Sequence, residues 1–269
     1  MSEYRTEAEA VARIAYDAAI PDQLDPGTIY SAPDGDGDIF VFNTDEYAPT
    51  PRRKTGTYRV TNVDHFIDYL TKHANPNTEL WGNPNNGTVK AVINAHGPNS
   101  EPAGWEDHTL TLTLTKTDDW NDWTNTDRKW QRQVDFAEFV EDHLHNFMTP
   151  TAAEMLELAQ SFTAHKTVAF ESGTRTNSGA TTLVYRETID SKAGRKGDIT
   201  IPDRLELKIP PFEGFNEYKV PARFRYRIND GALAMSVALE RPRDILNAAF
   251  EHVTAQITDE TNRTVWLTA

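Results

Sequence analysis

Three residues able to do chemistry, His96, Asp107 and His108, lie close together in the segment INAHGPNSEPAGWEDHTLTL, residues 93–112. Imidazole and carboxylate groups bind divalent metals and act as general acids and bases. A metal-dependent hydrolase centre built from these residues is therefore one hypothesis. The competing interpretation is structural: Trp105 and His108 pack the base of a β-hairpin, and Asp107 caps its loop.

The alternation of side chains along the two flanking strands favours the structural interpretation. His108 has the parity of Leu110 and Leu112 and should face the core, whereas His96 falls on the polar face of the preceding strand. The two imidazoles converge only if a β-bulge shifts one strand by a residue. No third ligand stands at a metal-binding spacing. We therefore expect no catalytic residue, no metal and no cofactor.

Sequence motifs of the common enzyme classes are missing. The chain contains no HExxH, no Walker loop, no GxGxxG and no GxSxG. It also has no cysteine, which excludes structural disulfides, thiolate metal sites and cysteine nucleophiles. The protein is therefore expected to be non-enzymatic.

The stretch ARFRYRI, residues 222–228, predicts a strand with one arginine face. Arg223, Arg225 and Arg227 would point the same way, about 7 Å apart. Guanidinium groups at this spacing need carboxylates or phosphates as partners. Acids on neighbouring strands, such as Glu206 and Glu240, can supply them. The open alternatives are the acidic segment of a second subunit and an anionic ligand.

Three tryptophans, Trp120, Trp123 and Trp130, crowd the stretch DDWNDWTNTDRKW. Exposed tryptophans can stack on nucleic-acid bases, but the neighbouring aspartates would repel phosphate. Core packing or a protein interface is therefore the favoured interpretation of these residues.

Charge is unevenly distributed along the 269-residue chain, whose formal net charge is −14. That charge makes generic binding to DNA phosphates or to anionic lipid unfavourable. Eight acidic and three basic residues fall between Asp118 and Asp142, whereas nine basic and five acidic residues fall between Lys192 and Arg227. The two segments can pair within one chain or between subunits, and we expect a homo-oligomer. Accessory nucleic-acid binding through the Arg223 face is the alternative.

Hydrophobic periodicity predicts an α+β fold, a mixed and mostly antiparallel β-sheet meander with about five helices. Capping boxes, Thr6-x-x-Glu9 and Thr151-x-x-Glu154, begin two of the helices. The other predicted helices cover residues 63–73, residues 135–147 and the stretch after Pro242. The predicted strands are residues 39–42, 89–95, 108–115, 199–212 and 264–267. Two further stretches are predicted to fold back on themselves, residues 165–189 at a turn over residues 177–179 and residues 220–240 at a turn over residues 229–231.

Two regions are expected along the chain. Residues 1–56 form a helix and an extended acidic segment, and residues 57–269 form the α+β domain. A division of the second region into two lobes near residue 165 stays open. No run of 18 apolar residues is long enough to span a bilayer, and the charged N-terminus does not resemble a secretory signal. We therefore expect the protein in the cytoplasm.

Several separated motifs occur in an order that resembles the YfdQ-like family of phage and prophage proteins, a domain of unknown function. The motifs are AGWEDH, VDFAEFVEDHL, SKAGRKGDITIPDRLELKIPPFEG and ARFRYRINDGALAMSVALERPRDILNAAFE, and the similarity covers roughly residues 50–267. The positions that match the motifs are Trp105, Asp107, His108, Phe136, Phe139, Pro202, Pro210, Phe212, Arg223, Arg225 and Pro242.

The resemblance implies a bacteriophage-encoded protein made in the cytoplasm of a host bacterium, and it implies no established activity. Taken with the acidic charge, it leads us to expect a non-enzymatic binding and assembly protein that associates with itself. Such a protein can act on a host or defence partner by occupying its DNA-binding surface, because carboxylates can take the place of DNA phosphates there.

Overall fold

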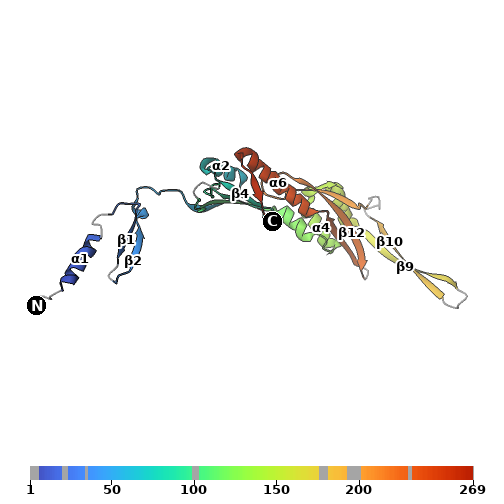
Figure 1. Ribbon diagram of the computed structural model, residues 1–269. Helices are drawn as coiled ribbons and strands as arrows, with labels where there is room; N and C mark the ends of the chain where they lie inside the picture. Colours follow the sequence, from blue (N-terminus) through green and yellow to red (C-terminus); the bar gives the residue numbers. More distant parts are fainter. Residues whose placement is uncertain are drawn as a thin grey trace. The chain divides into compact units, whose positions relative to one another are not determined.

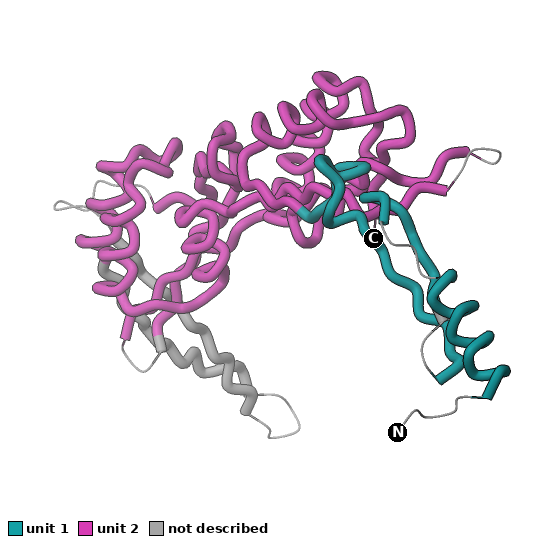
Figure 2. Tube along the Cα trace, turned by 90° about the vertical axis from the view of Figure 1, so that its left-hand side faces the viewer, with its two compact units in different colours: residues 1–57 teal, residues 58–269 magenta. Residues whose placement is uncertain are grey.

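The computed structural model divides the chain into two compact units, Met1–Thr57 and Tyr58–Ala269 (Figure 2). The described residues are 6–19, 24–33, 36–98, 103–175, 181–192, 201–229 and 232–268. For residues 163–175 and 181–192 the description covers the backbone alone.

The first unit contains a helix and a two-stranded hairpin, namely α1 (Glu7–Ala19), β1 (Ile29–Pro33), β2 (Ile39–Asn43) and the 3-10 turn η1 (Asp45–Tyr47). The predicted capping box is confirmed: the Glu9 backbone N–H donates to Thr6 Oγ1 at 3.3 Å, and the Thr6 N–H donates to Glu9 Oε2 at 2.9 Å. Strand β1 was not predicted. It pairs with β2 in antiparallel register, with Tyr30 opposite Phe42.

The second unit contains two five-stranded sheets (Figure 1). The first has the order β14-β4-β5-β6-β3 and is antiparallel through β4, β5 and β6, whereas β14 runs parallel to β4. Its strands are β3 (Gly56–Val60), β4 (Glu79–Asn83), β5 (Thr88–Val92), β6 (His108–Thr113) and β14 (Val265–Leu267). Helices α2 (Val63–His73) and α6 (Pro242–Thr261) share its hydrophobic core, which includes Phe66, Leu110 and Phe250.

The second sheet has the order β7-β13-β12-β11-β8 and is antiparallel throughout. Its strands are β7 (Gln131–Arg132), β8 (Phe147–Thr149), β11 (Arg204–Ile209), β12 (Tyr218–Asn229) and β13 (Ala232–Leu239). Helices α3 (Asp118–Thr126), α4 (Gln133–Asp142) and α5 (Ala152–Ser161) contribute to one core with this sheet. Strands β9 (Thr163–Arg175) and β10 (Thr181–Lys192) form a separate antiparallel hairpin.

The α+β prediction is confirmed, with six α-helices in the described part of the chain. Helix α2 has the predicted bounds, and its buried stripe is Val63, Phe66, Ile67 and Leu70, as expected. The predicted start of α5 is confirmed by its Thr151 and Glu154 capping box, and Pro242 lies in the first turn of α6. Helix α3 was not predicted. The turn expected at residues 177–179 lies outside the described residues, and so do residues 230–231 of the turn expected at residues 229–231.

The predicted helix over residues 135–147 is wrong in its last turn. Helix α4 ends at Asp142, and the chain continues as the 3-10 turn η2 (Leu144–Asn146) before entering β8. The His143 ring Nδ1 lies 2.8 Å from the Phe139 carbonyl oxygen, at the end of the helix. Phe147 then pairs with Leu207 of β11, so its apolar side chain is buried from a strand rather than from a helix.

Each of the two cores combines residues from before and after residue 165. The core under α2 and α6 contains Phe66 and Phe212, and the core under α3, α4 and α5 contains Trp123 and Phe224.

Among the described residues, no helix is both long and apolar enough to cross a membrane.

Asn146 ties α3 to the second sheet. Its side-chain carbonyl accepts from Trp123 Nε1 at 2.8 Å, and its amide donates to Asp119 at 3.0 Å and to the Lys208 carbonyl at 3.2 Å. We expect Asn146→Ala to lower the free energy of unfolding by about 1–3 kcal/mol, because it leaves buried polar groups without partners. Asn125→Ala, at an exposed position of α3, is the matched control. Equal unfolding midpoints for the two variants in urea would contradict this role.

Candidate functional site

The predicted hydrolase residues do not come together. His108 is buried, with 5% of its surface exposed, and its Nε2 lies 2.8 Å from the Tyr69 hydroxyl. His96 is exposed, and its Nε2 pairs with Glu106 at 3.3 Å. Asp107 accepts a hydrogen bond from the Asn94 side chain at 2.8 Å. Within the described residues no group of three histidine or acidic side chains can hold a metal ion.

The structural interpretation of this segment holds for His108 and is wrong for Trp105. Strand parity places His108 inside, beside the rings of Tyr58, Tyr69 and His73. Trp105, however, is 74% exposed and so does not pack the hairpin base. Asp107 accepts from the side-chain amide of Asn94, and the side-chain oxygen of Asn94 accepts from the His108 N–H at 3.0 Å.

The three clustered tryptophans divide between the core and the surface. Trp120 and Trp123 are 2% and 1% exposed, on the face of α3 that packs under the second sheet. This burial removes both from the predicted interaction residues. Trp130 is 38% exposed and lies against the guanidinium of Arg227, whose Cζ is 4.2 Å from the ring centroid. Trp130 alone of the three is therefore available to a partner.

Strand β12 places its arginines as the sequence predicts. Ala222, Phe224 and Ile228 are buried on one face of the strand, whereas Arg223, Arg225 and Arg227 are exposed on the other. Across the ladder Arg204 of β11 pairs with Arg223 and shares its face. We call the surface made of Arg204, Arg223, Arg225 and Arg227 the arginine face.

One arginine of this face has a strong partner within the chain. Arg223 Nε donates to Glu240 Oε1 at 2.7 Å. This hydrogen bond, and then the charge of Glu240, raises the pKa of Arg223, and the same hydrogen bond holds the pKa of Glu240 below its usual range. The predicted role of Glu240 is therefore confirmed. Glu206 instead pairs with Lys219 at 2.8 Å, so the prediction that it satisfies an arginine is wrong.

Arg225, at the centre of the arginine face, has a different environment. It lies opposite Ser236 of β13, whose side chain carries no charge. Among the described residues no carboxylate forms an ion pair with Arg225, since Glu240 is engaged by Arg223 and Glu206 by Lys219. Ser236 Oγ is itself buried and has no hydrogen-bond partner in this part of the chain. As far as the described side chains extend, the centre of the face therefore offers a guanidinium without an ion pair to the solvent.

A pocket of about 380 Å³ opens at one end of the arginine face. Arg128 and Arg241 join Arg223 and Arg225 in its lining, together with Glu240. Arg128 and Arg241 both have left-handed backbones, with φ of 59° and 49°. This conformation costs a residue with a side chain about 1–2 kcal/mol. Glycine would avoid that cost, so the two arginines are held at these positions against the local backbone preference.

Arg128 and Arg241 were not predicted as site residues. Pro242 predicts a helix start and so places residue 241 at its cap. Nothing in the sequence indicates the left-handed turn that brings the Arg241 side chain toward β12. Arg128 reaches the pocket because its backbone N–H donates to the Val237 carbonyl at 2.8 Å, a contact between residues far apart in the sequence.

An acidic surface lies on the helices that cover the other face of the second sheet. Its exposed residues are Asp118, Asp122, Glu138, Glu141 and Asp142 of α3 and α4. Because α3 and α4 pack on the apolar face of β12, this surface and the arginine face lie on opposite sides of the sheet. We call it the acidic face.

Two histidines lie beside the acidic face. His145 Nε2 is 2.8 Å from Asp119 Oδ2, and His143 Nε2 is 3.4 Å from Asp122 Oδ2. Burial by itself would raise the pKa of Asp119. Hydrogen bonds from Asn146 and His145, together with the charges of His145 and His143, lower this pKa by more than burial raises it, so it lies below its usual range. The site is a network of histidine–carboxylate contacts and, in the described residues, contains no metal ligand set.

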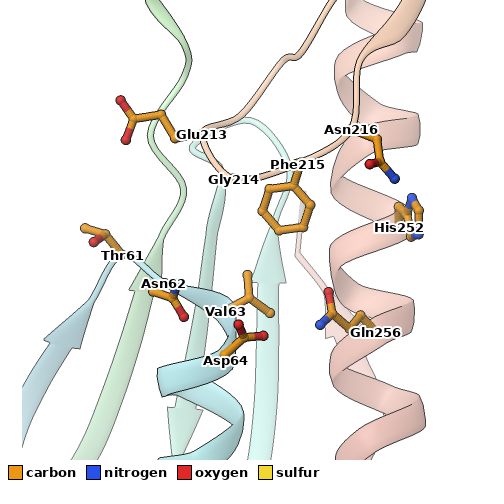
Figure 3. A pocket seen from close by; sticks show the side chains of 10 residues that line it. All are labelled: Thr61, Asn62, Val63, Asp64, Glu213, Gly214, Phe215, Asn216, His252 and Gln256. Carbon is orange, nitrogen blue, oxygen red and sulfur yellow. The ribbon is translucent and has the colours of Figure 1, made fainter.

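A second pocket, of about 420 Å³, lies between the start of α2, the turn at residues 213–216 and α6. Figure 3 shows Phe215 between the α2 and α6 residues, while Glu213 points away from His252. The lining combines acids, amides and one histidine without a cluster of like charge. This pocket therefore has a weaker claim to a charged ligand than the pocket at the arginine face.

Comparison with known proteins gives one result. The family model described as uncharacterized conserved protein (DUF2303) matches residues 4–267. The chain belongs to this family. No curated protein and no solved structure matches it. Membership assigns no activity, so the function of the DUF2303 chain has to be argued from its surfaces.

The lowered pKa of Asp119 makes a prediction about acid stability. A carboxyl group whose folded pKa is depressed stabilises the fold above its unfolded pKa of about 3.9, and this contribution is lost as the pH falls through the folded value. The native protein should therefore lose more stability on acidification below about pH 4 than Asp119→Asn does. Urea unfolding between pH 6 and pH 3 measures the difference, and parallel losses in the two proteins would contradict it.

Proposed function

We propose that this protein is a non-enzymatic binding and assembly protein, in which the arginine face of one copy binds the acidic face of the next. The observation that carries the proposal is Arg225, an exposed guanidinium at the centre of an arginine face, with no ion pair among the described residues. The same chain offers five exposed carboxylates on the opposite side of the sheet.

Electrostatic complementarity supports this pairing over generic binding of a polyanion. A chain with a net charge of −14 repels DNA and anionic lipid over most of its surface. A second copy presents its own carboxylates in a defined arrangement on α3 and α4. Complementary charges steer such encounters, and exposed aromatic groups such as Trp130, which lies against Arg227, can add desolvated contact.

The opposite placement of the two faces favours a head-to-tail contact. A two-fold dimer requires each copy to offer the same patch to the other. Here the arginine face of one copy binds the acidic face of the next, and the two faces differ. Each complex therefore still has a free acidic face at one end and a free arginine face at the other. Such contacts continue into a ring, a closed shell or a filament.

The setting and the further partner belong to the same proposal. The resemblance to YfdQ-like phage and prophage proteins supports a bacteriophage origin and action in the host cytoplasm. An acidic face left free at the end of an assembly presents carboxylates in place of DNA phosphates, which suits a host or defence protein with a DNA-binding surface. The direct test of this partner class is to measure whether this protein displaces DNA from such a purified host or defence protein.

Accessory nucleic-acid binding is the second candidate function. It is favoured by Arg225, which has no ion pair among the described residues, and by Arg227, whose guanidinium lies over the Trp130 ring. Guanidinium groups about 7 Å apart with an adjacent aromatic ring can follow a single strand. Filter binding to single- and double-stranded DNA at low salt distinguishes the two functions. Micromolar binding with a steep salt dependence, abolished by Arg223→Ala with Arg225→Ala, would favour nucleic acid.

Charge reversal on the arginine face tests the assembly. At low salt, light scattering of the native protein should give a mass several times that of the 30.3 kDa chain, and high salt should reduce it. Arg225→Glu should give a single chain at both salt concentrations. Lys90→Glu, the same charge change at an exposed position of β5 in the other sheet, should assemble like the native protein.

Mixing two defective variants tests the head-to-tail geometry. Glu138→Lys with Glu141→Lys keeps the arginine face intact, whereas Arg225→Glu keeps the acidic face intact. Their equal mixture has one functional contact and should stop at complexes of two chains. A mass of one chain for the native protein at low salt, or an Arg225→Glu variant that assembles normally, would contradict the proposal.

A further inference from the structure

We propose that the pocket lined by Arg128, Arg223, Arg225 and Arg241 is a binding site for a phosphate group carried by a small molecule. The proposal does not depend on self-association, since the pocket is formed within one chain. It rests on the charge of the lining, on the backbone of two of its arginines and on the helix end beside it.

The lining concentrates positive charge beyond what its own acids neutralise. Four arginines and one glutamate border the pocket, and Glu240 is engaged by Arg223 at 2.7 Å. The nearest acids of Arg128 and Arg241 are their chain neighbours Asp127 and Asp244, at 3.4 Å and 3.9 Å. Both pairs are longer than the roughly 2.7–2.9 Å of a good charge-assisted hydrogen bond. Arg128 Nη2 also donates to the Leu239 carbonyl, at a long 3.4 Å. With five N–H donors on each guanidinium, the four arginines keep donors available for an oxyanion.

The backbone indicates that two of these side chains are required for something other than folding. Four described residues other than glycine have a positive φ, and two of them, Arg128 and Arg241, line this pocket. Strained residues of this kind gather at ligand sites, where the side chain has a task that offsets the strain. Guanidinium is the side chain best suited to the oxygens of phosphate, because it donates in a planar, bidentate arrangement.

The start of α6 adds to the positive electrostatic potential at the pocket. Arg241 is the N-cap of this 20-residue helix and makes no side-chain capping hydrogen bond. The positive end of the helix dipole therefore lies next to the pocket without an acidic cap from its N-cap residue, an arrangement that favours anions. Asp244 in the first turn offsets part of this effect.

The size of the pocket points to a phosphate with an organic group attached. Its volume of about 380 Å³ is far larger than the roughly 10–15 Å³ that a cavity needs to hold one water molecule. A phosphate contacted by converging guanidiniums leaves much of this space unfilled. Ala238, which lies opposite Arg223 on the same face of the sheet, supplies an apolar side chain to the remainder of the lining. The chemical class we infer is a phosphomonoester, such as a nucleoside monophosphate.

Calorimetric titration at low ionic strength tests the site, with inorganic phosphate and a nucleoside monophosphate as the probes. We expect saturable binding of both, tighter for the monophosphate. Arg241→Gly should weaken both at least tenfold while leaving the melting temperature without ligand unchanged or higher, because glycine relieves the left-handed backbone. Arg225→Gln, on an exposed strand position, should weaken binding similarly and keep the fold.

Arg243→Ala is the matched control. Arg243 lies two residues after Arg241, contacts Asn85 and does not line the pocket, so the variant removes one positive charge from the same helix and leaves the lining intact. It should bind phosphate within twofold of the native protein. The proposal is overturned if saturable binding is absent both in the native protein and in the Glu138→Lys with Glu141→Lys variant, which leaves the arginine face uncovered by a second copy. It is also overturned if Arg243→Ala weakens binding as much as Arg241→Gly, or if Arg241→Gly lowers the melting temperature and keeps binding. Binding of a single-stranded oligonucleotide without binding of either small probe would assign the arginines to nucleic acid instead.

Discussion

Strand β12 alternates apolar and arginine side chains, and the second sheet is built around this alternation. Burying Ala222, Phe224 and Ile228 requires a cover of apolar helices on one face, and α3, α4 and α5 provide it through Trp123, Phe136 and Met155. Because successive side chains of a strand point to opposite faces, the same burial forces the arginines to the surface. Neither face can change without the other, since a shift of one residue would bury the arginines.

This constraint explains where the charges of the chain lie. The amphipathic helices that cover the apolar face turn their acids to the solvent, so carboxylates gather on one side of the sheet and guanidiniums on the other. The separation prevents the two groups from neutralising each other within one chain. It leaves local pairs such as Arg223 with Glu240, and it leaves Arg225 without a pair among the described residues. Exposed ion pairs contribute little to stability, so a gain in stability does not explain this arrangement, and recognition is the role that we propose for it.

The sequence was sufficient for features that depend on local periodicity. The parity of β12, the inward direction of His108, the bounds of α2 and the capping boxes of α1 and α5 all follow from spacing and residue type. Features set by distant contacts were not predictable. Trp105 is exposed although its neighbour His108 is buried, helix α4 ends early because Phe147 pairs with β11, and Glu206 pairs with Lys219 instead of an arginine. The pocket depends on two left-handed arginines, a backbone state that no residue pattern in the sequence indicates.

Zero-length crosslinking of amines to carboxylates tests the central claim most directly, because it reports which face touches which. The sample is a mixture of isotopically light and heavy Arg225→Lys protein. Links within one chain serve as the internal standard, and they are expected at Lys219–Glu206 (2.8 Å) and Lys208–Glu217 (3.3 Å). The account predicts additional links from the amine introduced at position 225 to Glu138 or Glu141 that join light to heavy chains, since the sheet separates these positions within one copy. Abundant links of the internal kind, with none between chains at low salt, would contradict it.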